Sequence, residues 1–62
     1  MSETIIKSII NTAIGHLRAG KLTFQHFGLD FTLSRMQGTI REFAVMTVDR
    51  SGNPLCVGHI VA

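Results

Sequence analysis

The sequence has little of what usually stabilises a very small domain or takes it to a membrane. A single cysteine, Cys56, excludes an intrachain disulfide but not a bridge between chains, and it is a weak indication of a reducing, cytoplasmic setting. No run approaches the roughly 18 consecutive apolar residues of a membrane span. The start of the chain lacks the basic segment of a secretory signal, because Glu3 is acidic and Lys7 and Asn11 interrupt the first apolar residues. We expect a soluble protein of the cytoplasm.

Charge is also sparse and the glycines are scattered along the chain, and both features restrict the function. Charged residues make up 16% of the chain, and the six Lys and Arg include no cluster of adjacent basic residues. The net charge of +2 is therefore only a weak indication of a nucleic-acid partner. The six glycines stand one at a time, which excludes a glycine-rich phosphate-binding loop.

The chain is short for a globular domain, at 62 residues. This length holds a single core, so residues 1–62 are expected to form one unit. A domain of this size commonly needs a disulfide, a metal or a partner subunit for stability. The hydrophobic fraction of 45% is high for a chain with so much surface. We therefore expect some apolar surface to be shared with another chain.

Apolar residues at spacings of three and four predict an amphipathic helix over residues 3–19. The apolar positions are Ile5, Ile6, Ile9, Ile10, Ala13, Ile14 and Leu17. They cover about half of the circumference, whereas a face docked on one sheet covers roughly 100°. Gly20 is expected to end the helix in the left-handed conformation. The surplus width predicts that part of this face contacts a partner.

Three stretches are typical of strands and predict an antiparallel meander beneath the helix. The expected strands are residues 27–34, 39–48 and 55–61. In the first, Phe27 and Phe31 alternate with polar residues, which predicts a buried phenylalanine face. Gly38 is expected to give the following hairpin a residue of positive φ. Residues 21–26 either form a strand of their own or join the next strand through a bulge or turn.

Cys56 and His59 form the sharpest local motif, because a Cys-x-x-His spacing occurs in zinc sites. In a regular strand the two residues point to opposite faces, so both reach one ion only if Gly58 forms a bulge or turn. His16 and His26 are the other histidines available to complete such a site or to serve a Cys56 nucleophile. A buried small thiol and an edge or interface histidine are the simpler interpretation. We expect no metal, no cofactor and no catalytic residues.

Nucleic-acid binding is the alternative function, and it needs a basic surface with a groove-reading element or stacking aromatics. The candidate phosphate contacts are Lys7, Arg18, Lys21, Arg35, Arg41 and Arg50. A helix followed by three strands divides these charges between the two ends of the sheet. Arg35 and Arg41 are expected at one end, and Arg18, Lys21 and Arg50 at the other. This division weakens the nucleic-acid hypothesis.

The sequence therefore predicts an α+β domain, in which an N-terminal amphipathic helix packs on a three-stranded antiparallel meander and self-association completes the fold. We expect a non-enzymatic regulatory or inhibitory module that acts through protein–protein contacts, as a homodimer or larger homo-oligomer. Its size suits an accessory protein of a phage, plasmid or bacterium. The helix face is wide, and the strand over residues 39–48 is apolar on both faces. The predicted interface residues are Ile6, Ile10, Ile14, Phe43 and Val45.

Overall fold

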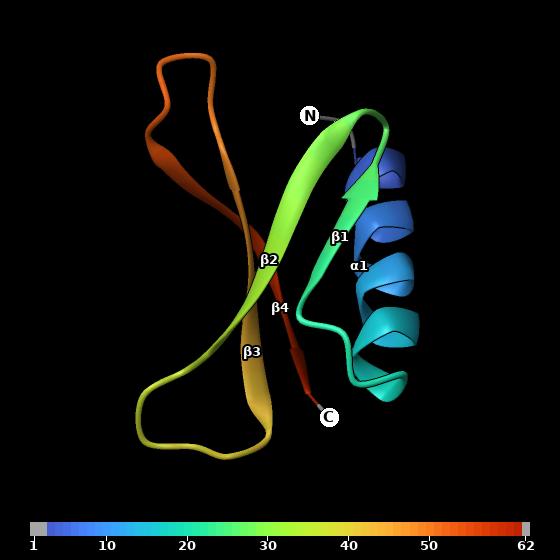
Figure 1. Cartoon of the computed structure of the whole chain (residues 1–62), viewed down its shortest axis with the longest axis vertical. Coiled ribbons are helices and arrows are strands. Elements are labelled where there is room, and N and C mark those ends of the chain that lie inside the picture. The colour runs from blue at the N-terminus through green and yellow to red at the C-terminus, as the bar shows by residue number, and fades with distance from the viewer. Residues whose placement is uncertain (1–2, 62) are drawn as a thin grey trace.

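The structure, a computed structural model, describes residues 3–61 as one helix packed on a single sheet (Figure 1). The elements are α1 (Glu3–Arg18), β1 (Thr23–His26), β2 (Leu29–Arg35), β3 (Glu42–Val48) and β4 (Pro54–Val61). The strands are neighbours in chain order, and each pair is antiparallel. The α+β class is confirmed, but the sheet has four strands instead of three. Among residues 3–61, no helix combines the length and hydropathy needed to cross a bilayer.

The helix α1 forms where the apolar spacing predicts it and ends one residue before the expected boundary. Gly20 sets this end, because its φ of +79° is the left-handed conformation that glycine adopts at low cost. The Gly20 amide donates to the Leu17 carbonyl at 3.0 Å, and the Lys21 amide donates to the His16 carbonyl at 2.9 Å. These two bonds satisfy carbonyls of the last turn in a Schellman motif. The chain therefore leaves the helix in a defined direction, toward β1.

The additional strand comes from a two-residue turn at Phe27 and Gly28. Both residues have positive φ, +53° and +73°, as in the type I′ turn of a tight hairpin. Gly28 adopts this conformation readily, whereas Phe27 does so against its steric preference. The predicted strand over residues 27–34 is therefore wrong at its start, and residues 23–26 form a strand of their own. Phe27 is 63% exposed at the turn, while Phe31 is buried as predicted.

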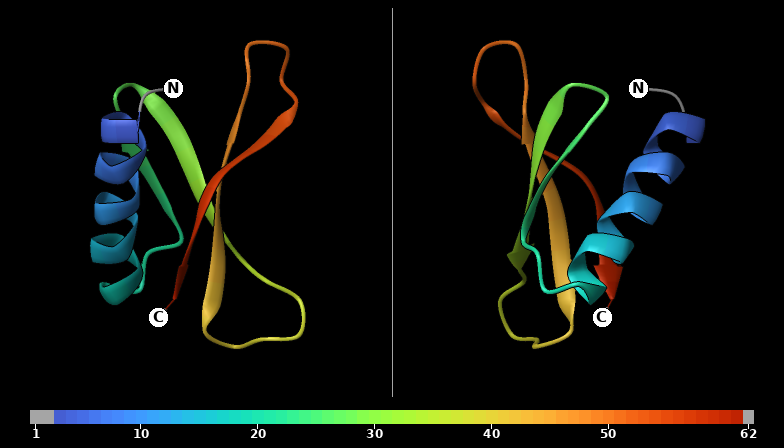
Figure 2. Two further views of the ribbon diagram at one scale, coloured as in Figure 1. Left: turned by 180° about the vertical axis from the view of Figure 1, so that it is seen from behind. Right: turned by 45° about the vertical axis from the view of Figure 1, so that its right-hand side comes forward.

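The core lies between the helix and one face of the sheet (Figure 2). The ring of Phe31 in β2 stacks on Phe24 in β1 with centroids 5.2 Å apart, and Phe24 stacks on His16 of α1 at 5.0 Å. These stacked rings join the helix to the first hairpin. The buried apolar residues are Ile9, Ala13, Phe24, Phe31, Leu33, Phe43, Val45 and Ile60.

The helix approaches β4 very closely at Gly58. A Cβ atom at this position would lie 2.7 Å from Cδ1 of Ile10, well inside van der Waals contact. Glycine therefore allows the helix to pack this near to the strand. α1 contacts both edge strands of the curved sheet, β1 and β4 (Figure 2).

The turn between β3 and β4 is organised by Asp49. Its Oδ1 accepts hydrogen bonds from the amides of Ser51 and Asn53, each at 2.9 Å. Backbone hydrogen bonds, that of Asn53 above all, hold the pKa of Asp49 below its ordinary value, because they favour the charged carboxylate. The ionised carboxylate of Asp49 thus stabilises the turn more than its protonated form does.

We expect Asp49→Ala to destabilise the domain at neutral pH and to lose much of this effect in acid. A carboxylate with a lowered folded-state pKa contributes stability above its unfolded-state pKa of about 3.9. That contribution disappears as the pH falls through the folded-state value. Urea unfolding over this range measures the difference in free energy between wild type and variant. Asp49→Asn is the control, because it keeps an acceptor oxygen without the charge. A wild-type advantage over Asp49→Ala that stays constant in acid would contradict this role.

Candidate interaction surface

The strand β4 lies at an edge of the sheet, and no strand within residues 3–61 pairs with its outer side. It spans eight residues, Pro54–Val61, and contains no Asp, Glu, Lys or Arg. Natural proteins protect an exposed edge with charges, proline or a bulge, because its free amides and carbonyls invite another strand. β4 has a proline at its start and a bulge near its middle, but no charge. The opposite edge strand, β1, is four residues long and offers a shorter template.

A bulge in β4 turns Cys56 and His59 to the same side of the sheet. The register against β3 shifts between Cys56 and Gly58, so that Val57 is an extra residue without a partner of its own. Cys56 and His59 then both lie on the face away from α1. Cys56 Sγ lies 3.9 Å from His59 Nε2 and donates to the Gly58 carbonyl at 3.4 Å. The geometric objection to a shared site, opposite faces in a regular strand, is therefore removed.

This pair supplies two potential metal ligands from one chain. Among residues 3–61, no group of three or more His, Cys, Asp and Glu side chains is placed to hold a metal ion. His16 stacks on Phe24, and His26 Nε2 is hydrogen-bonded to Ser8 Oγ at 3.0 Å. The two histidines that the sequence offered as further ligands instead hold the helix against the first hairpin.

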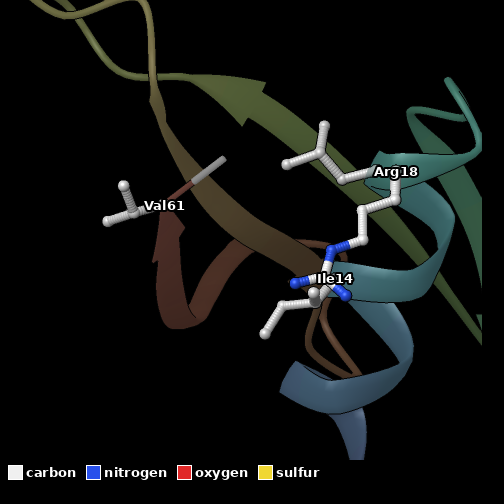
Figure 3. Close-up of a pocket in the computed structure, with 4 residues that line it drawn as sticks. Ile14, Arg18 and Val61 are labelled. Atoms are coloured by element: carbon white, nitrogen blue, oxygen red, sulfur yellow. The ribbon is translucent and has the colours of Figure 1, made fainter.

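A small pocket lies where the last turns of α1 meet the end of β4 (Figure 3). It is lined by Ile14, Leu17, Arg18 and Val61 and has a volume of about 130 Å³. An engineered cavity of about 150 Å³ binds benzene, so this pocket has room for one apolar side chain. We name the edge strand and this pocket together the β4 surface. Its residues are Leu55, Cys56, His59 and Val61 of β4, with Ile14, Leu17 and Arg18 of α1.

The structure separates the predicted interface residues into two groups. Phe43 and Val45 are buried, because these positions of β3 face α1. They are core residues, which corrects the prediction that they form an interface. Ile10 and Ile14 are half-buried and pack against the core, and Ile14 also lines the pocket. Ile6 is half-buried on the helix. The part of the predicted interface that remains accessible therefore lies on α1.

The basic residues gather at one end of the molecule, contrary to the sequence prediction. The lower end in Figure 1 carries the end of α1, the β2–β3 loop and the end of β4. It holds Arg18, Lys21, Arg35 and Arg41, with Glu42 as the acidic residue. The upper end holds Glu3, Asp30 and Asp49, with Lys7 and Arg50 as the basic residues. The additional strand β1 causes this polarity, because it reverses the direction of every strand that follows.

Several functional features of this surface were not predicted from the sequence. Leu17 and Val61 belong to ordinary apolar patterns, and nothing in the sequence shows that they meet in a pocket. Gly58 is the one signal for the bulge that unites Cys56 and His59. Comparisons with protein-family models, curated proteins and solved structures found no match.

Proposed function

We propose that this chain is a non-enzymatic regulatory or inhibitory binding module that acts through protein–protein contacts and forms a homodimer. In the dimer, β4 pairs antiparallel with β4 of a second copy and joins the two sheets into one. The free edge of β4, eight residues long and without charge, carries the proposal. A two-fold axis makes this contact self-complementary, because each copy presents the same surface to the other.

The charge distribution supports an antiparallel arrangement. Two-fold pairing of β4 lays the basic lower end of one copy beside the upper end of the other, where acidic residues outnumber basic ones. Complementary charges of this kind steer two partners together and disfavour the wrong orientation. A parallel arrangement would instead place the two basic ends side by side.

The exposed apolar groups of β4 also favour a partner. Leu55 and Val61 are 43% and 68% exposed, and both lie on the strand with the free edge. Burial of such side chains contributes about 25 cal/mol per Å² of apolar surface. The pocket between α1 and β4 offers space for an apolar side chain of the second copy. The free, exposed thiol of Cys56 is compatible with a reducing, cytoplasmic compartment.

Sedimentation velocity tests the dimer. At protein concentrations of tens of micromolar, we expect the wild type to sediment as a species of twice the 6.8 kDa mass of one chain. Leu55→Lys and Val61→Lys should each weaken dimerisation by about tenfold or more, because an edge lysine opposes strand pairing. Ile40→Lys is the matched control, since Ile40 is 78% exposed in the β2–β3 loop and lies outside β4. A folded wild type that stays monomeric, or an equal loss from Ile40→Lys, would overturn the proposal.

Nucleic-acid binding is the second candidate, because four basic residues share the lower end. Two of the candidate phosphate contacts, however, already have partners. The guanidinium carbon of Arg35 lies 5.7 Å from the centroid of the Phe43 ring, and Lys7 Nζ at the upper end lies 3.3 Å from Glu3 Oε1. The exposed Phe27 ring lies at the upper end, away from the basic group. Titration with duplex and single-stranded DNA separates the candidates. Micromolar binding that falls steeply with salt would favour nucleic acid, and no binding at low salt would remove it.

A further inference from the structure

We propose that the dimer binds one zinc ion through Cys56 and His59 of both copies. The inference rests on the proposed function, because one chain supplies two of the four ligands that a structural zinc site uses. It deepens that function by placing a metal at the two-fold axis, where its binding free energy adds to that of strand pairing.

The separation of the two side chains fits two ligands of one tetrahedral ion. Zn–S bonds of about 2.3 Å and Zn–N bonds of about 2.0–2.1 Å place the sulfur and nitrogen about 3.6 Å apart. Cys56 Sγ and His59 Nε2 are 3.9 Å apart in the structure. Both residues are exposed, so a small side-chain rotation closes the difference without moving the core.

The bulge in β4 places the side chains of Cys56 and His59 on one face of the sheet. Residues three positions apart in a regular strand lie on opposite faces. The extra residue Val57 brings Cys56 and His59 together on the face that α1 does not cover. Solvent, the ion and a second copy can all reach this face. The bulge interrupts the regular strand and thereby produces an accessible half-site with two ligands.

Two-fold pairing of β4 doubles this half-site. Cys56 and His59 flank the bulge near the middle of β4, so a register that sets Cys56 opposite His59 of the second copy gathers four ligands at the axis. Directly opposed residues of antiparallel strands have Cβ atoms about 4.5–5.5 Å apart, which lets four side chains converge on one ion. Two thiolates neutralise Zn²⁺, and their two protons pass to solvent when the metal binds.

Cobalt titration of the reduced chain tests this site, because tetrahedral thiolate-bound Co²⁺ has strong visible and ultraviolet absorption. We expect saturation at one Co²⁺ per two chains and displacement by Zn²⁺. Sedimentation should show more dimer with zinc than after chelation. A phosphine reductant keeps Cys56 reduced, so a disulfide between copies cannot produce the dimer.

Cys56→Ser and His59→Gln should each weaken zinc binding by more than about 100-fold, since loss of an outer-shell partner alone costs about 10–100-fold. His26→Gln is the control, because His26 lies on β1 and should leave zinc affinity unchanged. A metal-free dimer that binds no Co²⁺ would overturn the zinc site and leave the proposed dimer standing. One ion per monomer would also overturn the shared site. A monomer with and without zinc would overturn both proposals.

Discussion

Phe31→Ala is expected to abolish cooperative folding of the domain. Phe31 is 1% exposed, and its ring stacks on Phe24 at 5.2 Å between the helix and the sheet. Replacing a buried phenylalanine by alanine costs about 3–5 kcal/mol, because contacts are lost and a cavity remains. The core of so small a domain rarely supplies more than about 3–5 kcal/mol of net stability. The variant therefore retains little or no free energy of folding.

Urea unfolding followed by circular dichroism measures this effect, at protein concentrations below the dimer range. Phe27→Ala is the matched control, because Phe27 is largely exposed at the β1–β2 turn. Its free energy of unfolding should stay within about 1 kcal/mol of the wild type. If Phe31→Ala unfolds cooperatively at a urea concentration near the midpoint of Phe27→Ala, the stacked rings do not stabilise the core as proposed.

Gly58→Ala should destabilise the domain by about 1–3 kcal/mol through overpacking, and Ile10→Val should rescue it. The added Cβ would lie 2.7 Å from Cδ1 of Ile10 but 3.5 Å from its Cγ1. Ile10→Val removes Cδ1 and alone costs about 0.5–1.5 kcal/mol. In that background Gly58→Ala fills the vacated space, and the loss of backbone freedom in the unfolded chain favours alanine. The double variant should therefore have a higher free energy of unfolding than the sum of the two single effects predicts.

A double-mutant cycle of unfolding free energies measures this coupling. Gly15→Ala is the matched control, because no atom outside its own helix backbone lies within 4 Å of a Cβ at this exposed position. Alanine in the helix interior should stabilise the domain by about 1 kcal/mol and show no coupling to Ile10→Val. Additive effects of Gly58→Ala and Ile10→Val would show that the helix does not press on β4 at this point.

The fold was predictable where residues a few positions apart determine the structure. The isoleucine spacing predicts α1, and the left-handed residues at its end and in the β2–β3 loop, Gly20 and Gly38, have φ values of +79° and +85°. The alternation around Phe31 predicts the buried face of β2. The sequence does not distinguish a strand from a turn at β1, because four residues give too short a pattern.

The candidate site was predictable only in part. The Cys-x-x-His motif was visible, but its two residues share a face only because the register of β4 shifts at Val57. Val45 was predicted at an interface because both faces of its strand are apolar, and the packing of α1 decided which face is buried. The basic end arose from β1, since one additional strand reverses the positions of all later loops.

The amino-acid sequence by itself determined the amphipathic helix, its end at Gly20 and the alternating faces of β2. These features depend on local backbone preference and on side-chain periodicity. Only the tertiary structure decided the number of strands, the polarity of charge and the meeting of Cys56 with His59. A left-handed Phe27 and a bulge at Val57 are both locally unfavourable. They are stable because strand pairing and the packing of α1, which join residues distant in the sequence, compensate their cost.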